Sequence, residues 1–388
     1  MHYAAVCGLH RFAKYLSIGH SQDVNFRSFD EKWTPLHVAS TYGHVEVTRT
    51  LVEQGADTTV KDKHGKTPLH VASAKGHVGV AEILIEHGAD ATALDNERNT
   101  PLHAASKEGH LQVARYLVDH GADEVAREND PLQVASIFGH VDIARFLIER
   151  GADTAGLTME GWTPLHSAST YGHVKVARFY IDQGMDVTAR DYSGWTPMHL
   201  AANYGYMDVI RVLAEHGADA KAQANDGQSP LHVASSYGNT VVARGLVEYG
   251  ADVTARDNDG WTPLHYASYC GDMAISRFLI ESGADAAARD NRGLTPWDVA
   301  SRRGHVHVAG FLAEVGGRPT VPENDRRTPS HGMAEERNMG FGRVPVEHGA
   351  YPTIRVDNGW TPWDEEVEEE REVEVPRIAV EDSAYRTT

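Results

Sequence analysis

The stretch Trp162–Asp186, WTPLHSASTYGHVKVARFYIDQGMD, recurs in close copies at a 33-residue step through most of the chain. Only the fourth step is shorter, by three residues. Self-similarity at such a period is typical of repeat proteins, in which neighbouring units bury one continuous core. Nine full copies are opened in turn by Thr34, Thr67, Thr100, Asp130, Thr163, Thr196, Ser229, Thr262 and Thr295.

The local chemistry of one copy predicts two helices. Thr163 followed by Pro164 favours a helix start, because threonine caps free N–H groups and proline at the first helical position loses no hydrogen bond. Gly172 suits a left-handed helix end about eight residues later. A longer second helix begins near Val174, has its apolar residues on one face and ends at Gly184. Each unit is therefore expected to bury this face against its neighbours.

A 33-residue unit with TPLH opening the first helix and GAD following the second resembles the ankyrin repeat. The resemblance implies an all-α solenoid of helix-turn-helix units with projecting β-hairpin-like loops. A small residue that lets stacked helices approach closely fills one position in every copy: Ala39, Ala72, Ala105, Ala135, Ala168, Ala201, Ala234, Ala267 and Ala300. Leucine fills a second-helix position in all copies but one, where Tyr180 stands.

The repeat frame divides the chain into four parts. They are a partial or capping repeat at 1–33, nine ankyrin repeats at 34–317, a degenerate repeat or linker at 318–363, and an acidic tail at 364–388. Met1 and His2 align with the middle of a repeat, so the chain either starts with a modified cap or begins inside a longer parent sequence. Near Asp123 the short spacer loses the usual turn, and this junction could bend the stack.

The two C-terminal parts depart from the repeat for different reasons. Thr328 keeps the 33-residue frame, but Pro345 falls where the second helix needs its leucine. An interior proline costs a helix about 3 kcal/mol, so a normal repeat is not expected there. Between Asp364 and Glu374 eight carboxylates are opposed only by Arg371. Their mutual repulsion predicts an extended, disordered tail.

Charge and cysteine usage limit the partners and the compartment. The formal net charge is −19, which repels nucleic acid and anionic membranes but attracts a basic protein surface or segment. The alternative is that the charge only keeps a long stack soluble. Cys7 and Cys270 lie about eight repeats apart, too far for a disulfide in a linear stack. With no export signal, we expect an intracellular, cytoplasmic or nuclear protein that is monomeric.

The 23 histidines follow the repeat and so predict structure, not chemistry. Seven occupy the TPLH position: His37, His70, His103, His166, His199, His232 and His265. Six follow the turn glycine: His44, His77, His110, His140, His173 and His305. In ankyrin-like stacks the first set is expected to tie helix starts together by hydrogen bonds, and the second to support the turn. His305 and His307 fall on different helix faces, which disfavours a metal site.

No catalytic constellation stands out from the repeat. The serines of HVAS and HSAS belong to a packed helix, the glycines are caps and turns, and the aspartates of the GAD step hold turns. We therefore predict a protein that is not an enzyme and has no cofactor, no metal and no catalytic residues.

The repeats differ most informatively at two positions. Eight residues after the opening residue, the copies carry Tyr42, Lys75, Glu108, Phe138, Tyr171, Tyr204, Tyr237, Cys270 and Arg303. Just before the opening residue, they carry Trp33, Lys66, Asn99, Asn129, Trp162, Trp195, Gln228, Trp261 and Leu294. In ankyrin-type stacks these positions line a concave groove. The predicted partner-binding residues, called the aromatic strip below, are Phe138, Trp162, Tyr171, Trp195, Tyr204, Tyr237 and Trp261.

Two interpretations of the aromatic strip remain open. Exposed tyrosine and tryptophan are favoured binding anchors, because they bury a large area with few rotatable bonds. Alternatively, the tyrosines pack on the next helix and the tryptophans brace their own loops. Lys75 and Glu108 at the tyrosine position argue against a purely structural role.

The sequence therefore predicts a non-catalytic protein–protein interaction scaffold or adaptor that binds its partner in the concave groove. An alternative function is the targeting or regulatory arm of a larger multidomain enzyme or signalling protein. A third is a purely structural spacer.

Overall fold

The computed structural model describes residues 24–122 and 130–317. Within these ranges the chain forms nine helix pairs and no strand, which confirms the all-α solenoid. The predictions made for 1–23, for the short spacer at 123–129 and for 318–388 lie outside the described residues.

The helix bounds follow the repeat frame. The first helices are α3 Pro35–Tyr42, α5 Pro68–Lys75, α7 Pro101–Glu108, α9 Pro131–Phe138, α11 Pro164–Thr170, α13 Pro197–Tyr204, α15 Pro230–Ser236, α17 Pro263–Cys270 and α19 Pro296–Arg303. The second helices are α4 Val45–Glu53, α6 Val78–Glu86, α8 Leu111–Asp119, α10 Val141–Glu149, α12 Val174–Asp182, α14 Met207–Glu215, α16 Thr240–Glu248, α18 Met273–Glu281 and α20 Val306–Glu314.

Reciprocal caps start the first helices. At α3, the Thr34 N–H donates to His37 Nδ1 over 3.2 Å, and the His37 N–H donates to Thr34 Oγ1 over 3.4 Å. Gly43 ends the helix in the left-handed conformation, at φ 71°. Helix α9 differs, because its cap Asp130 accepts from the Leu132 N–H at 2.8 Å without the reciprocal bond. The sequence therefore sets both ends of these short helices locally.

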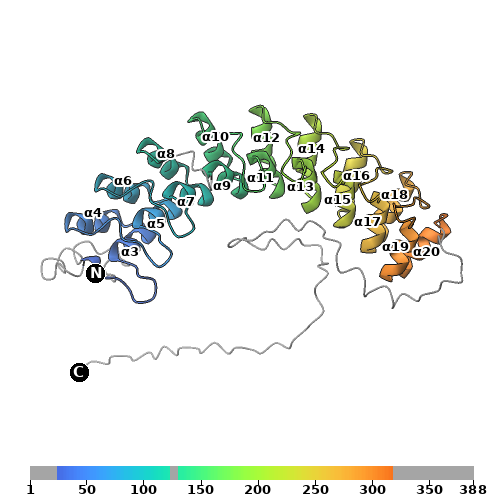
Figure 1. Cartoon of the computed structure of the whole chain (residues 1–388). Helices are drawn as coiled ribbons and strands as arrows, with labels where there is room; N and C mark the ends of the chain where they lie inside the picture. The colour runs from blue at the N-terminus through green and yellow to red at the C-terminus, as the bar shows by residue number, and fades with distance from the viewer. Residues whose placement is uncertain (1–23, 123–129, 318–388) are drawn as a thin grey trace, which may run out of the picture. The chain divides into compact units, whose positions relative to one another are not determined.

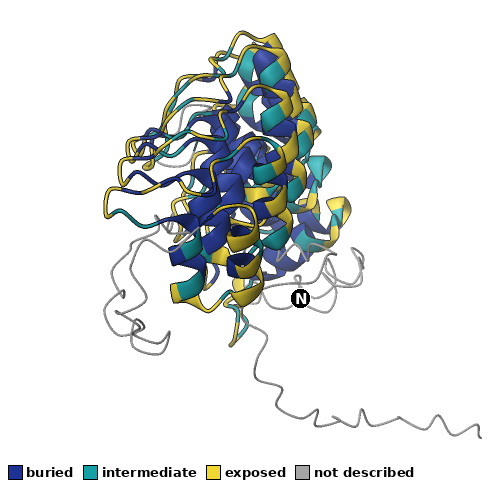
Figure 2. Cartoon of the chain, turned by 90° about the vertical axis from the view of Figure 1, so that its right-hand side faces the viewer, coloured by how far each residue is buried: buried dark blue, intermediate teal, exposed yellow. Residues whose placement is uncertain are grey.

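The pairs stack side by side in two layers. Figure 1 shows the odd-numbered first helices in one layer and the even-numbered second helices in the other. The alanine position is fully buried in all nine repeats, which lets adjacent first helices approach closely. Figure 2 shows the buried residues gathered inside the stack, with exposed residues on the loops and the outer helix surfaces. Each repeat thus shares its core with its neighbours.

The projecting loops are joined to one another by hydrogen bonds. The Asn258 N–H donates to Asp226 O at 2.9 Å, and its side-chain amide donates to Asn225 O at 2.9 Å. Asn291 repeats both bonds one unit later, to Asp259 O and Asn258 O. The loops are therefore hairpin-like turns that support each other, although the described residues contain no regular strand.

Tyr180 occupies the position that holds leucine in the other repeats, and it is fully buried. Ser136 donates its hydroxyl hydrogen to Leu132 O, so Tyr180 must donate its own to Ser136 Oγ. Burial raises the pKa of the Tyr180 phenol, which keeps it protonated as that donor. The exception is therefore accommodated by one polar contact across adjacent repeats.

Candidate partner-binding surface

The first-helix members of the aromatic strip lie where these helices end. Phe138 and Tyr204 are the last residues of α9 and α13, and Tyr171 and Tyr237 directly follow α11 and α15. Tyr204 is 42% exposed and Tyr237 is 54% exposed. Phe138 and Tyr171 are half-buried. The structure thus places these four rings at the same position of four successive repeats.

Three of these four rings contact a neighbouring side chain. Lys107 Nζ lies 5.4 Å from the centre of the Phe138 ring. The Tyr204 ring stacks on Tyr206 with centroids 6.3 Å apart, and Tyr171 stacks on His173 at 6.5 Å. A ring held in this way loses little conformational freedom when its other side is covered.

Two of the three tryptophans brace the loops. The indole N–H of Trp162 donates to Asp191 Oδ2 at 3.2 Å, and that of Trp261 donates to Asp290 Oδ2 at 3.1 Å. Each aspartate belongs to the next loop along the stack. Trp261 is only 7% exposed and also packs on Tyr266, so the exposure expected for it is wrong. The buried indole therefore packs its own loop against Tyr266 and Tyr269 of α17.

Trp195 differs because its neighbour lacks the aspartate. The position held by Asp191 and Asp290 in other loops is Ala224 in the loop after Trp195. Trp195 is half-buried, and its ring lies 5.9 Å from His199, tilted by 33°. Among the three tryptophans of the strip, Trp195 is therefore the one that lacks an aspartate at this position of the next loop.

Toward α19, a cysteine and then an arginine replace the aromatic residue of the strip at this repeat position. Cys270 follows Tyr237 at the same repeat position, and its thiol donates to Ser236 O at 3.1 Å. Burial raises the pKa of this thiol to about 11, so it is protonated at neutral pH. One repeat further, the Arg303 guanidinium lies 4.1 Å from the centre of the Tyr269 ring. A cation thus closes the strip at this end.

The TPLH histidines act as the sequence predicts. Nε2 of His199 bonds to Gln228 O, and Nε2 of His232 bonds to Trp261 O, each at 3.1 Å. A carbonyl only accepts, so Nε2 carries the hydrogen and Nδ1 accepts from the backbone. Burial lowers the pKa of both rings to about 4, which keeps them neutral. They link each first helix to the next loop.

The histidines after the turn glycine link repeats in the opposite direction. His77 Nε2 bonds to Thr41 O of the preceding first helix at 3.1 Å, and its ring covers Gly43. Support of the turn is confirmed, but the supported turn belongs to the preceding repeat.

The described parts of the chain hold neither a metal-binding cluster nor a membrane-spanning helix. Residues 24–122 and 130–317 contain no group of three or more histidine, cysteine, aspartate or glutamate side chains placed to hold a metal ion. None of the helices in these ranges has the length and apolar character needed to span a membrane.

Sequence reasoning missed a second ordered surface, on the second helices. Six consecutive copies expose an arginine at the fifth position of this helix, called the arginine row below: Arg115, Arg145, Arg178, Arg211, Arg244 and Arg277. Four of these guanidinium groups cover a phenylalanine of the next repeat, at 4.5 to 4.9 Å from the ring centre. The signal was present in the sequence as an arginine and a phenylalanine repeating in register.

Comparison with known families agrees with the geometry. A sequence family described as ankyrin repeats (3 copies) matches overlapping stretches at 1–95, 54–128, 88–155, 124–191, 154–224, 190–257 and 255–323. These matches cover most of the chain, which therefore belongs to the ankyrin-repeat family. Ankyrin repeats generally mediate protein–protein interaction, and proteins built from them are typically non-catalytic.

A solved structure supports the same assignment. The crystal structure of the human ASB11 ankyrin repeat domain is similar to this chain at 27% sequence identity, with a TM-score of 0.53. The likeness covers 57% of this chain and 99% of that domain. No curated protein sequence matches.

Proposed function

We propose that this protein is a non-catalytic, intracellular scaffold or adaptor whose aromatic strip binds a segment of a partner protein. The observation that carries the proposal is the exposure of Tyr204 and Tyr237 at one position of adjacent repeats. Phe138, Tyr171, Trp162 and Trp195 extend the same surface, and buried Trp261 supports it. Tyrosine and tryptophan anchors of this kind supply much of the binding energy at protein interfaces.

The charges beside the strip favour a basic partner segment. The loops that carry Trp195 and Trp261 also carry the exposed carboxylates Asp186, Asp252 and Asp259. Hydrogen bonds from the Thr188 hydroxyl and backbone N–H lower the pKa of Asp186, and Thr254 does the same for Asp252. Asp186 and Asp252 therefore stay negative at neutral pH. Lysine or arginine flanking an apolar segment would complement them, and such pairing mainly raises the association rate.

The test is affinity capture from cell extract with the full chain and a Tyr204→Ala, Tyr237→Ala variant. Truncating an anchor typically costs 2 kcal/mol or more, so we expect the captured proteins that use the strip to fall by about thirtyfold. The matched control is Tyr42→Ala, because Tyr42 occupies the same repeat position and is 53% exposed outside the strip. Circular dichroism establishes that each variant is folded.

Two outcomes count against the proposal. An identical set of captured proteins for wild type and the double variant would show that the aromatic strip has only a structural role. Equal losses from Tyr42→Ala and the double variant would show that exposed tyrosine at this position matters nonspecifically.

A further inference from the structure

A pocket opens on the second-helix layer, between α10 and α12, and its volume is about 340 Å³. Its apolar lining consists of the Phe179 ring, which is 6% exposed, and half-buried Val141. Exposed polar side chains form the rim: Arg145, Lys175, Arg178, Asp182 and Gln183. The pocket therefore combines an apolar floor with a rim of three cations and one carboxylate.

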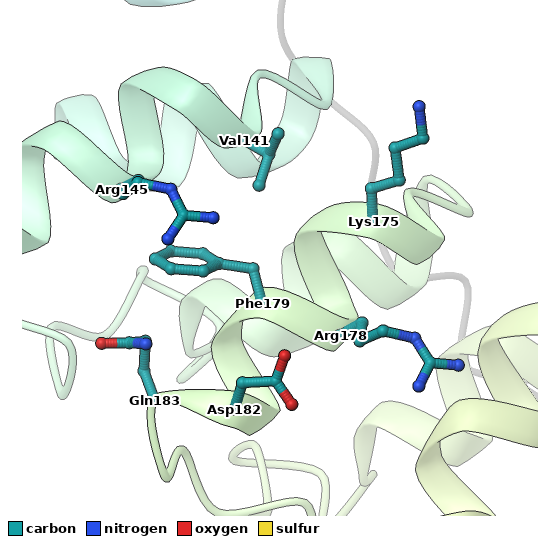
Figure 3. A pocket seen from close by; sticks show the side chains of 7 residues that line it. All are labelled: Val141, Arg145, Lys175, Arg178, Phe179, Asp182 and Gln183. Carbon is teal, nitrogen blue, oxygen red and sulfur yellow. The ribbon is translucent and has the colours of Figure 1, made fainter.

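The charged groups of the rim are separated from one another. Arg145 reaches from α10 to the Phe179 ring of α12, and its guanidinium carbon lies 4.5 Å from the ring centre. Figure 3 shows Arg145 and Lys175 on one side of this ring and Asp182 on the other. The ring holds the guanidinium group in place without neutralising its charge. The positive side of the rim is thus distinct from the negative side.

Two of the three cations have no partner among the described residues. The side chains of Arg145 and Lys175 make no ion pair and no hydrogen bond with any residue in 24–122 or 130–317. Arg178 approaches Glu215 of α14 at 3.7 Å, and both side chains are about half exposed. An arginine can bind a carboxylate through two parallel N–H bonds, and Arg145 retains this capacity.

Lys175 distinguishes this place from the rest of the second-helix layer. It is the only lysine or arginine at the second position of the nine described second helices, and α10 and α14 carry Asp142 and Asp208 there. Helix α12 therefore has two cations against one carboxylate. Each of the other eight described second helices has at least as many carboxylates as lysines and arginines. The pocket is thus the positive point of a layer that is otherwise neutral or negative.

We propose that this pocket binds a segment of a partner protein in which acidic residues flank one apolar side chain. The apolar side chain covers Phe179 and Val141, and the acidic residues pair with Arg145 and Lys175, away from Asp182. The volume lies near the lower end of the range for ligand sites, about 300–1,000 Å³, which suits a side chain and not a whole helix. The site goes beyond the proposed function, because it uses the second helices and not the aromatic strip.

The surroundings of the pocket favour such a segment over other anions. A nucleic acid would also meet Asp142 and Glu149 of α10 and Glu215 of α14, and the net charge of −19 repels it. A free phosphate would pair with the cations but would leave the apolar floor uncovered. Exposed ion pairs contribute little free energy, so the apolar side chain must supply most of the binding, while the cations select an acidic sequence.

The test is fluorescence anisotropy of labelled peptides titrated with the full chain. The probe is the peptide Glu-Glu-Leu-Glu-Glu, called the leucine peptide, and the comparison is Glu-Glu-Ser-Glu-Glu, called the serine peptide. The two peptides carry the same charge and differ only in the side chain offered to the apolar floor. We expect the leucine peptide to bind about tenfold more tightly.

Two matched pairs of variants locate the binding site. Lys175→Asp introduces the residue that α10 and α14 carry at this position, and should weaken binding of the leucine peptide by about fivefold or more. Lys221→Asp makes the same charge change on an exposed lysine of the loop layer and should leave binding nearly unchanged. Arg145→Gln should weaken binding by about fivefold. Arg244→Gln removes a guanidinium group that lies 4.6 Å from the Phe278 ring and should not weaken it.

A further variant separates this site from the proposed function. Tyr204→Ala with Tyr237→Ala alters the aromatic strip and should bind the leucine peptide as the wild type does. The capture experiment can therefore fail while the peptide binds, and the reverse is equally possible.

Three results would overturn the proposal. They are the absence of saturable binding of the leucine peptide, equal binding of the two peptides, and equal losses from the two members of each variant pair. Inorganic phosphate that competes as strongly as unlabelled leucine peptide, at equal ionic strength, would make the pocket a site for a small anion instead. The peptide comparison uses the wild-type chain, so it holds even if a variant fails to fold.

Discussion

At the scale of single residues, the TPLH histidines are neutral groups that bond at both ends. His199 accepts from the Thr196 N–H on Nδ1 at 3.1 Å and donates from Nε2 to Gln228 O at 3.1 Å. One repeat of the chain uses glutamine instead, and Gln133 donates to Trp162 O at 3.0 Å. The donated bond between repeats is therefore common to histidine and glutamine, whereas the accepted bond at the cap is made by the histidines and, in the last repeat, by Asp298.

This difference gives a graded prediction for His199. His199→Ala leaves the Thr196 N–H without a partner and removes one of the two hydrogen bonds to the Gln228 carbonyl, which also accepts from the Ala224 N–H. It should lower the free energy of unfolding by about 2–3 kcal/mol. His199→Gln keeps the donated bond and should cost only about 1 kcal/mol. Urea unfolding followed by circular dichroism measures both. Equal costs for the two variants would show that ring packing, not hydrogen bonding, explains the histidine.

The same burial predicts a loss of stability in acid. The pKa of His103, His199 and His232 is lowered from 6.5 to about 4 in the folded chain. Between these values the unfolded chain binds more protons, so unfolding becomes easier as the pH falls from about 6.5 to about 4. Each histidine contributes up to about 1.4 kcal/mol per pH unit in this window and nothing further above it.

Melting temperatures measured between pH 7.5 and 4.5 test whether stability falls in acid and whether the buried histidines cause the fall. Asp130 acts in the opposite sense, because burial raises its pKa to about 6 and its protonation favours the folded state. Three histidines outweigh this one group. His232→Gln should flatten the slope, and an unchanged slope in that variant would assign the acid sensitivity to other residues.

The histidines and tryptophans differ in how far the sequence predicts their contacts. The cap partner of each TPLH histidine is three residues away, so the repeat itself predicts the contact. The partner of each indole N–H lies in the next loop, where Asp191 and Asp290 accept but Ala224 does not. The burial of Trp261 depends further on Tyr266 and Tyr269, two aromatic residues specific to its repeat.

At the scale of the helices, two glycines of one repeat have similar backbone conformations but different neighbours. Gly172 ends the turn after α11 with φ 72°, and Gly184 follows α12 with φ 84°. A Cβ at Gly184 would meet nothing within 4 Å, whereas one at Gly172 would approach the Tyr206 ring at 2.5 Å. The two positions therefore share the left-handed conformation but differ in their surroundings.

Alanine at each position should reveal this difference. Gly184→Ala only forces alanine into the left-handed conformation, which should lower the free energy of unfolding by about 1 kcal/mol. Gly172→Ala must also displace the tyrosine ring and should cost about 2–4 kcal/mol. Thermal unfolding of the single variants, together with Gly172→Ala in a Tyr206→Asn background, measures the steric part. If the asparagine background recovers nothing, the clash does not explain the cost.

The arginine row marks the limit of sequence reasoning about elements. Helix bounds follow from short-range signals, and these predict the starts, the ends and the buried face. The arginine contacts join residues about one repeat apart, as Arg244 covers Phe278 and Arg277 covers Phe311. They become visible only when the second helices are known to stack in register.

At the scale of the whole chain, the repeat sequence specifies a stack in which each unit contacts its neighbours. Helices α3 to α20 pack against their own partner and the adjacent pairs. The nine-repeat region was predictable because every unit carries the same packing residues. The exposure of the aromatic and charged side chains along the surface was only partly predictable, because it depends on the residues that the next repeat places beside them.

Nearest-neighbour packing predicts that a core defect stays local. Leu279 of α18 and Leu69 of α5 are both fully buried and lie near opposite ends of the described stack. Leu279→Ala should cost about 2–5 kcal/mol and speed amide hydrogen exchange in α17 to α20, while α3 to α6 stay protected. Leu69→Ala should produce the reverse pattern. Exchange mass spectrometry of both variants resolves the helices separately. If either variant raised exchange uniformly across 24–122 and 130–317, the stack would unfold as one cooperative unit, and the interfaces between repeats would be stronger than the repeats themselves.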